Sequence, residues 1–483
     1  MSRILLGPIN RVEGDLDISL DMQGQEVKAA QVNSTLYRGF EQILVGKPAL
    51  DALVYTPRIC GICSVSQSYA SALALADALQ LQAPRNGELC RNLMLANESV
   101  TDLFTHFYLF FMPDFARSHY AQASWYPAIA QRFQAVKGEA AKEALKARAE
   151  FLHLMGLLGG KWPHTLSLQP GGSSKPVKPQ ERLKLLSLLQ NFRQFLEKHT
   201  FAAPLETLNS LETPEQLEAW RRSADWQQGD LRRFLHLSDA LNLQQLGRAT
   251  DHFLSYGNFP LQGQKYFPAG SWQPGVGVQP LDPEQITEDV TSAWMAADQA
   301  RHPFEGQTQP VVEKDGAYSW CKAPRLQGQV METGALARAL VKGHPLLTRL
   351  VETWGGCVYT RILARLLEIA ALVPEMERWA KALRPDEPFC NHQELPDQAQ
   401  GVGMLEAARG SLGHWIRLEK GRISHYQIIA PTTWNFSPRD AQGQPGALEQ
   451  ALAGTRLEEG GGDSVVVQHI LRSFDPCMVC TVH

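Results

Sequence analysis

Helical spacing of the hydrophobic residues dominates this chain. In residues 181–199, leucine and phenylalanine recur at helical spacing, and residues 64–79 are rich in alanine, leucine and serine. Residues 89–112 are apolar almost all round, which is typical of a helix buried on every side. Residues 137–158 and 334–371 are predicted to be mainly helical as well. The pattern therefore predicts a largely helical core.

Strand-like patterns are confined to a few short segments. Residues 16–32 and 415–429 each show short apolar stretches on either side of a turn, which predicts two hairpins. Residues 256–280 are rich in glycine, proline and aromatic residues and predict a long ordered loop or a run of short strands, and residues 464–470 predict a final strand. The predicted fold class is mainly α with small β-hairpin or sheet elements. No repeat or low-complexity linker divides the chain, so a single domain, 1–483, is expected.

The composition indicates a soluble globular protein. The chain has 483 residues, of which 44% are hydrophobic and 20% charged, with a net charge of −4. This small charge favours neither nucleic acid nor an anionic membrane as a partner. No apolar run approaches the roughly 18 residues of a transmembrane segment, and no signal peptide is evident, so a cytoplasmic location is expected. The eight cysteines are too few for a disulfide scaffold; Cys90, Cys321, Cys357 and Cys390 stand alone and are predicted to be buried apolar residues.

The other four cysteines form two CxxC pairs at opposite ends of the chain. They are Cys60 with Cys63, and Cys477 with Cys480. One pair alone could be a redox dithiol, half of a zinc site or two buried cysteines, but two pairs supply four thiolates, enough for a tetrahedral metal site. The pairs lie 414 positions apart (477 − 63), far more than in zinc ribbons. We therefore expect a metal site at the centre of the fold, built from both chain ends. The chemistry alone favours zinc first and an iron–sulfur centre second.

The residues around these pairs point to one family. Six motifs stand in order from residue 7 to residue 483: Gly7-Pro8-Ile9-Asn10-Arg11-Val12-Glu13-Gly14, Arg38-Gly39-Phe40-Glu41, Arg58-Ile59-Cys60-Gly61-Ile62-Cys63, Asp102 four residues before His106-Phe107-Tyr108, Arg409-Gly410-Ser411-Leu412-Gly413-His414-Trp415, and Asp475-Pro476-Cys477-Met478-Val479-Cys480-Thr481-Val482-His483. Together they resemble the large subunit of the nickel–iron hydrogenases.

The resemblance implies a role for each of the four cysteines. Cys60 and Cys477 would bind nickel terminally, and Cys63 and Cys480 would bridge nickel and iron. The iron would also carry cyanide and carbonyl ligands, installed by maturation proteins. The substrate would be dihydrogen, split into a proton and a hydride.

Four further residues are implied near the metals. Glu13 matches the carboxylate that accepts the proton, and Arg409 matches an arginine above the metal pair. Asp102 and Asp475 match the aspartates that hold this arginine. The family usually has proline just before the arginine, whereas this chain has Ala408.

The resemblance also implies a magnesium ion near the C-terminus. Glu41 and His483 match its ligands, and a main-chain carbonyl within 427–429 is a further candidate. A carboxylate with waters is ordinary magnesium chemistry, although a histidine ligand is not. His106 and His414 are expected either in the core or behind the metal ligands.

The cysteine count also predicts a partner. Outside the two CxxC pairs, no cysteines cluster at iron–sulfur spacing, so electrons need another chain to leave. The resemblance identifies that chain as the iron–sulfur small subunit and implies a heterodimer.

Three departures from the usual motifs narrow the resemblance. Gln67 stands where the family usually has a histidine after the first pair, and Asp15 stands where it has one after Glu13-Gly14. Ile62 and Phe110 replace the smaller Val and Leu at the gas channel. We expect Gln67 to donate a hydrogen bond to a cysteine sulfur, and the two larger residues to restrict oxygen.

This combination resembles the hydrogen-sensing regulatory hydrogenases, which have low turnover and signal through a histidine kinase. A chain that stops at His483 fits that group, because most relatives carry an extension that is cleaved off. The alternatives are an energy-conserving uptake enzyme and a metal-free or zinc-bound relative. The last is disfavoured because all four cysteines are kept.

Overall fold

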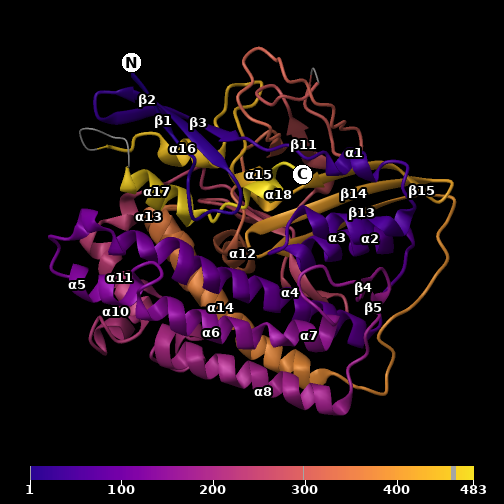
Figure 1. The fold of residues 1–483 in the computed structure, drawn as a ribbon, viewed down its shortest axis with the longest axis horizontal. Coiled ribbons are helices and arrows are strands. Elements are labelled where there is room, and N and C mark those ends of the chain that lie inside the picture. Colours follow the sequence, from indigo (N-terminus) through magenta and orange to yellow (C-terminus); the bar gives the residue numbers. More distant parts are fainter. Residues whose placement is uncertain (1, 297–298, 458–463) are drawn as a thin grey trace.

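The structure, a computed structural model, describes residues 2–296, 299–457 and 464–483. It is mainly helical, with long helices stacked in one half and small sheets gathered in the other (Figure 1). The helices are α1 (Phe40–Leu44), α2 (Ala52–Tyr55), α3 (Ser64–Ala78), α4 (Arg85–Thr105), α5 (Tyr126–Phe133), α6 (Glu139–Phe151), α7 (His153–Gly159), α8 (Pro179–Phe195), α9 (Leu205–Asn209), α10 (Pro214–Arg222), α11 (Asp230–Ala240), α12 (Ala335–Lys342), α13 (Pro345–Trp354), α14 (Val358–Ala382), α15 (Pro431–Asn435), α16 (Ala447–Leu452), α17 (Val465–Ser473) and α18 (Met478–Thr481).

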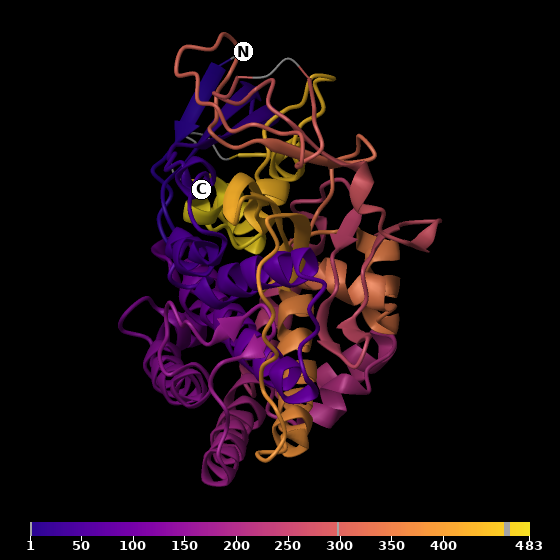
Figure 2. The same cartoon turned by 90° about the vertical axis from the view of Figure 1, so that its right-hand side faces the viewer.

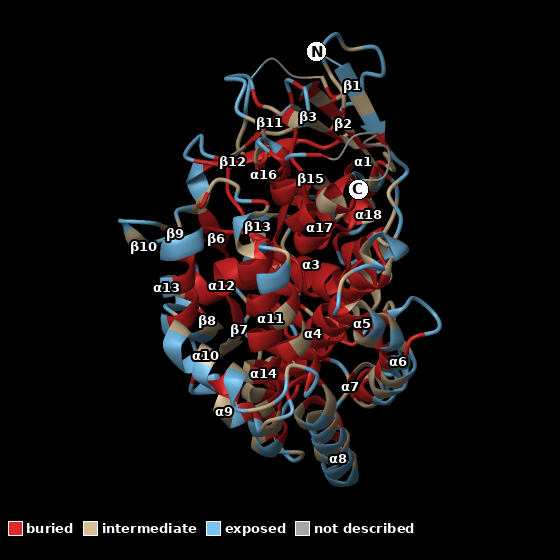
Figure 3. Cartoon of the chain, turned by 90° about the vertical axis from the view of Figure 1, so that its left-hand side faces the viewer, coloured by how far each residue is buried: buried red, intermediate tan, exposed pale blue. Residues whose placement is uncertain are grey.

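The central helices α3, α4 and α12 are buried along most of their length, as Figure 3 shows. Helix α4 confirms the expectation of a helix buried on every side, although several of its buried residues are polar, and it packs against α14. Beyond Thr105 the backbone widens into a π-helical turn over His106–Phe111 and then tightens at Met112–Ala116, where Pro113 cannot continue the hydrogen-bond ladder.

The strands form small antiparallel sheets. They are β1 (Ser2–Leu6), β2 (Leu16–Gln23), β3 (Glu26–Ser34), β4 (Leu168–Gln169), β5 (Gly172–Ser173), β6 (Phe253–Ser255), β7 (Asn258–Leu261), β8 (Gln264–Phe267), β9 (Gly270–Gln273), β10 (Gly277–Gln279), β11 (Ile286–Asp289), β12 (Ala323–Leu326), β13 (Gln398–Ala407), β14 (Gly410–Glu419) and β15 (Arg422–Ile429). Both predicted hairpins are present, as β2–β3 and β14–β15. The segment 256–280 is a run of short strands.

The sheet of β13, β14 and β15 has one strand more than the sequence suggested. Helix α3 lies against β13, and the contact requires glycine. A Cβ at Gly403 would lie 1.9 Å from the carbonyl oxygen of Ala70, and one at Gly401 would lie 2.2 Å from that of Ala74. The strand therefore sits directly on the helix that follows the first CxxC pair.

The predicted final strand at 464–470 is wrong, because these residues begin α17. Ser464 starts the helix by accepting a hydrogen bond from the Val467 N–H through its side chain. A short run rich in valine does not distinguish a strand from a buried helix by its periodicity alone, and here packing selected the helix.

The two ends of the chain meet inside the molecule. Glu13 pairs with Cys477 in an isolated parallel bridge, and the Met478 N–H donates to the Glu13 carbonyl at 2.7 Å. Figure 2 shows the yellow C-terminal segment beside indigo N-terminal elements. In the part of the chain that the structure describes, no helix is both long and apolar enough to cross a membrane.

Candidate metal centre

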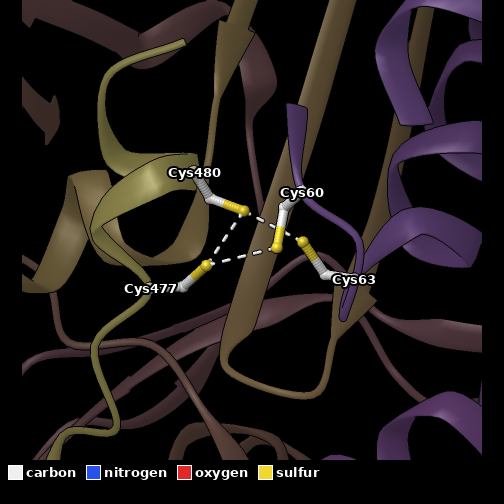
Figure 4. A group of neighbouring side chains, drawn as sticks. All are labelled: Cys60, Cys63, Cys477 and Cys480. Carbon is white, nitrogen blue, oxygen red and sulfur yellow. Dashed lines mark hydrogen bonds between the residues drawn. The ribbon is translucent and has the colours of Figure 1, made fainter. Parts of the chain in front are cut away.

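The four cysteines of the CxxC pairs converge on one point (Figure 4). Their sulfurs all lie within 4.8 Å of one another. The Sγ–Sγ distance is 2.9 Å between Cys63 and Cys480, 3.2 Å between Cys477 and Cys480, and 3.6 Å between Cys60 and Cys477. All four are free thiols, and all but Cys63, which is partly exposed, are buried. The sequence-predicted cluster is thus assembled by the fold.

Two of these thiols stand at the N-termini of helices. Cys63 is the N-cap of α3 and Cys477 the N-cap of α18, and neither side chain caps its helix. Each of these sulfurs is therefore left for another ligand. The Cys477 N–H donates instead to Thr432 Oγ1 at 3.1 Å, which ties the second pair to α15.

Arg38 joins the two cysteine loops. Its Nη2 donates to the carbonyl of Ile59 at 2.6 Å and also to the carbonyl of Val479. Sequence reasoning gave no role to Arg38, although its place in the Arg38-Gly39-Phe40-Glu41 motif marked it. The side chain locks together segments from opposite ends of the chain.

The thiol cluster favours a bound cation. Hydrogen bonds from its sulfur neighbours, first from Cys477, lower the pKa of Cys60 well below its usual value. Hydrogen bonds with Cys477, Cys480 and Cys60 raise the pKa of Cys63. Burial is the main cause that raises the pKa of Cys477 and of Cys480. The bare cluster thus holds one thiolate readily and resists four. A cation between the sulfurs would allow all four to deprotonate.

Glu13 lies beside this cluster on the segment that pairs with Cys477. Burial raises the pKa of its carboxyl group, negative charge on Cys60 raises it further, and Arg409 opposes both. The next residue, Gly14, has a φ of +87°, and a Cβ there would lie 3.0 Å from Val479 Cγ1. A glycine is therefore needed for this close approach.

Arg409 is fully enclosed and held by the two predicted aspartates. Its Nη1 lies 2.7 Å from Asp102 Oδ2, its Nη2 lies 3.2 Å from Asp475 Oδ1, and its Nε donates to the Asp475 carbonyl at 3.0 Å. Burial raises the pKa of Asp102 to about 8, against the lowering effect of Arg409 and with the help of Asp475. One guanidinium cannot neutralise two buried carboxylates, so the bare site favours a proton on Asp102, and positive charge from a metal centre would allow both aspartates to ionise.

Glu98 is a site residue that sequence reasoning missed. It stands one helical turn before Asp102 on α4, and its carboxylate accepts hydrogen bonds from the Val65 N–H and the Ser66 N–H, each at 2.8 Å. Because Cys63 does not cap α3, Glu98 satisfies the open end of that helix from the neighbouring helix. Burial raises the pKa of Glu98 to about 7. A glutamate four positions before Asp102 was the available signal.

A small cavity adjoins the cluster. Its volume is about 10 Å³, close to the space needed for one water-sized molecule. Ile62 and Gln67 both line it, together with Cys63, Glu98 and Asp102. Phe110, the other predicted gas-channel residue, does not line it. It lies partly exposed in the π-helical turn, where its carbonyl accepts a hydrogen bond from Arg11.

Gln67 does not donate to a cysteine sulfur as expected. Its Oε1 accepts a hydrogen bond from His414 Nε2 at 2.9 Å, and His414 Nδ1 lies 2.8 Å from the Tyr426 hydroxyl. Burial lowers the pKa of His414 to about 3, so this histidine is neutral. His106, whose pKa burial lowers to about 4, faces the Arg472 carbonyl at 2.6 Å. His414 thus supports a cavity residue, whereas His106 belongs to the core.

The predicted magnesium ligands also come together. His483 Nε2 lies 3.2 Å from Glu41 Oε1 and 2.9 Å from the carbonyl oxygen of Ile428, within the predicted range 427–429. Lys322 adds a cation, 3.3 Å from Glu41 and 3.1 Å from Glu288. Burial would raise the pKa of Glu41, but Lys322 and His483 outweigh it and lower that pKa to about 2.

The solitary cysteines stand apart from this centre. Cys90, Cys321 and Cys357 are buried, as predicted, but Cys390 is only partly buried and was wrongly placed in the core.

The fold and the buried four-cysteine site define a metalloprotein whose metal ligands come from both chain ends. A family model described as nickel-dependent hydrogenase matches residues 38–135 and 234–483, more than half of the chain. The chain belongs to the nickel-dependent hydrogenases, and it is the large subunit of such an enzyme.

Several known proteins resemble it over nearly their whole length. The hydrogenase-1 large chain of Citrobacter freundii is 28% identical, over 100% of this chain and 95% of that protein. The uptake hydrogenase large subunit of Rhodobacter capsulatus is 27% identical with the same coverage. Among solved structures, the Ni-Fe-Se hydrogenase from D. vulgaris Hildenborough in the reduced state superimposes with a TM-score of 0.85 at 28% identity, covering 100% of both chains.

Proposed function

We propose that this subunit cleaves dihydrogen heterolytically at a nickel–iron centre and serves a hydrogen-sensing complex. The observation that carries the first part is the convergence of four cysteine sulfurs within 4.8 Å beside a buried arginine. When bound, a nickel–iron centre would supply the redox chemistry that splits dihydrogen into protons and electrons.

The sulfur geometry supports unequal roles for the four cysteines. A single ion with metal–sulfur bonds of about 2.3 Å would place the sulfurs of a regular tetrahedron about 3.8 Å apart. The Cys63–Cys480 edge, at 2.9 Å, is much shorter than this. The shortest edge is the one between Cys63 and Cys480, the two cysteines that the family resemblance assigns to both metals, and Cys60 and Cys477 would bind nickel alone. The cyanide and carbonyl ligands of iron would come from maturation proteins.

Glu13 moves the proton away from this centre. A cysteine thiolate would accept the proton first, and Glu13, whose pKa is raised by burial and by negative charge on Cys60, would receive it next. Arg409 holds its charge over the cavity because Asp102 and Asp475 fix the guanidinium from two sides. The arginine therefore orients charge and excludes water but does not carry the proton.

A magnesium ion fits between Glu41, His483 and the Ile428 carbonyl. Octahedral ligands at about 2.1 Å from magnesium lie about 3 Å from one another, and the pairs here are separated by 2.9 and 3.2 Å. His483 Nδ1 faces the Cys480 carbonyl at 3.0 Å, so its N–H can donate there while Nε2 stays available for a metal. This ion would link the last residue to the cysteine loop.

Electrons leave through a second chain. Among the described residues, Cys60, Cys63, Cys477 and Cys480 form the one cluster of cysteines that could hold a metal centre. We therefore assign an iron–sulfur small subunit as the partner in a cytoplasmic heterodimer.

The sensing role rests on the cavity residues Ile62 and Gln67 and on Asp15. Ile62 narrows the cavity beside the metals, and Gln67 with neutral His414 replaces a residue that could become charged. The second candidate is an energy-conserving uptake hydrogenase, favoured by the similarity to the uptake subunit of Rhodobacter capsulatus.

Metal analysis tests the proposed centre. Protein produced with its maturation machinery should contain one nickel and one iron per chain, and replacing any of the four cysteines by serine should abolish hydrogen–deuterium exchange. Stoichiometric zinc in the parent protein would overturn the assignment.

Kinase phosphorylation separates the sensor from the uptake enzyme. The purified heterodimer is mixed with the histidine kinase from the same organism, with and without dihydrogen, and a Cys480→Ser heterodimer is the control. A sensor changes phosphorylation only with intact cysteines and reduces dyes slowly. Fast dye reduction with no effect on the kinase would favour the uptake role.

A further inference from the structure

The tight turn that carries Arg409 lacks the backbone conformation that usually stabilises a two-residue hairpin loop. Ala407 pairs with Gly410 at the end of the β13–β14 ladder, so Ala408 and Arg409 alone form the loop. Two-residue hairpin loops prefer positive φ at one or both positions, because this matches the twist of the strands. Neither Ala408 nor Arg409 has a positive φ, and the positive φ at this turn, +134°, falls on Gly410 outside the two-residue loop. The pose of Arg409 therefore depends on contacts from outside the hairpin.

A buried arginine on α12 supplies those contacts. Arg338 Nη1 donates to the carbonyl of Ala407 and Nη2 to the carbonyl of Ala408, both at 2.9 Å. These are the two residues immediately before Arg409. Arg338 thus binds the backbone of the turn, while the Arg409 side chain contacts Asp102 and Asp475.

The remaining donors of Arg338 fix the arginine itself. Nε and Nη2 donate to the two oxygens of Glu368 on α14, at 2.9 and 2.8 Å, and Nη1 donates to Glu406 at 2.9 Å. All five N–H donors of the guanidinium are thereby used, and the side chain is buried. The other oxygen of Glu406 accepts from Ser411 Oγ at 2.6 Å, which connects the network to β14. We call Arg338 with Glu368 and Glu406 the clamp.

We infer that Arg338 is the positioning residue for Arg409. The guanidinium fixes two adjacent carbonyls of the turn in one orientation, and Glu368 anchors it to the longest helix of the fold. A lysine keeps the charge but has three donors on a single atom, so it cannot hold both carbonyls and both carboxylates. The inference deepens the proposed function, since it rests on Arg409 acting above the metal pair.

The variants Arg338→Lys and Arg325→Lys provide a matched comparison. Arg325 is equally buried and also uses all five donors, on Asp440, Ser437 and three carbonyls, but it does not touch the turn. Displacing a catalytic group by about 1 Å can cost about 100-fold in rate. We expect Arg338→Lys to lower exchange per nickel by about 10–100-fold, and Arg325→Lys to leave it within about threefold.

Two further readouts separate positioning from general damage. The carbonyl and cyanide infrared bands of Arg338→Lys should broaden or split, because Arg409 then takes several poses, whereas those of Arg325→Lys should stay single. The crystal structure of Arg338→Lys should show Arg409 displaced from Asp102. Equal activity, single bands and an undisplaced Arg409 would overturn the inference.

Rescue by proline completes the test. Proline at 408 fixes φ at about −65° without a clamp, and within the described residues the Ala408 N–H donates to no protein acceptor. Ala407, in an extended strand, tolerates a following proline. Ala408→Pro should restore most of the exchange lost in Arg338→Lys, and no recovery would count against the clamp.

If Arg338→Lys does not fold, Glu368→Gln takes its place, since it keeps the side-chain shape and loosens the anchor. Unchanged infrared bands in that variant would also refute the clamp. A parent protein without nickel and iron would instead overturn the proposed function. In that case, comparing the position of Arg409 in crystal structures of the parent and the variant still tests whether Arg338 positions Arg409.

Discussion

Replacing Glu98 by glutamine should loosen the first half of the cysteine cluster. Glu98 Oε1 accepts from the Ser66 N–H and the Ser66 hydroxyl, and Oε2 accepts from the Val65 N–H and from Trp162 Nε1. A glutamine has one oxygen and one NH₂ group. Its best orientation places the NH₂ toward Ser66, because the hydroxyl can rotate and accept. The Ser66 N–H then loses its acceptor three residues after Cys63.

An unsatisfied buried donor costs about 1–3 kcal/mol. The loss falls on the first turn of α3, whose N-cap is the metal-binding Cys63, and is therefore expected to shorten nickel retention as well as to lower stability. The assay is the thermal unfolding midpoint together with the nickel that remains after dialysis against a chelator.

Glu449→Gln is the matched control. Glu449 is also buried, accepts from the Val32 N–H, the Tyr318 hydroxyl and the Gly446 N–H, and has a pKa that burial raises to about 7. It caps α16, away from the cysteines. Both variants should unfold at lower temperature, but only Glu98→Gln should lose nickel faster. Equal nickel retention in the two would refute the reasoning.

Four further outcomes are expected. Glu13→Gln should keep its metals but lose exchange with solvent protons, because an amide does not relay a proton; full exchange measured by mass spectrometry would remove Glu13 from the path. Gln67→His should still assemble with nickel, since histidine also offers a ring nitrogen to the neighbouring imidazole; a nickel-free product would show a role in assembly. Ile62→Val should make hydrogen activation sensitive to air, whereas Phe110→Leu should not, because only Ile62 lines the cavity; activity assayed before and after air exposure decides this. Asp114→Asn should reduce the loss of folding stability that the parent protein shows as pH falls. Burial opposes ionisation of Asp114, but His469, Arg472 and Arg11 outweigh burial and lower the pKa of this carboxyl group. Its stabilisation is therefore present above the unfolded pKa of about 3.9 and is lost as pH falls toward the folded value. Identical acid unfolding of parent and variant would contradict that assignment.

Local patterns predicted much of the architecture. The apolar run at 89–112, the serine- and alanine-rich segment after Cys63 and both hairpins were readable because each depends on neighbours in sequence. The meeting of both CxxC pairs was readable because four thiolates have few other uses.

The supporting network could not be read in this way. Arg38 and Arg338 act on carbonyls, and any residue type supplies a carbonyl, so the sequence carries no mark of the partner. The π-helical turn at His106–Phe111, in which Phe110 lies partly exposed, was not readable from the spacing of residues 89–112, which indicated an unbroken buried helix. The segment 464–470 failed because its valines suit a strand and a buried helix equally.

The separation of the two cysteine pairs along the chain also determines how long the first pair exists before the second is synthesised. At about 5–20 residues per second, the 414 positions between Cys63 and Cys477 separate their emergence from the ribosome by roughly 20–80 s. During that interval Cys60 and Cys63 lack the second pair of thiols. Arg38 can bind the Ile59 carbonyl but not that of Val479, and Glu41 lacks its contact with His483. Closure of the site thus joins segments that are made far apart in time, and the four-cysteine ligand set is incomplete until residue 480 has been synthesised.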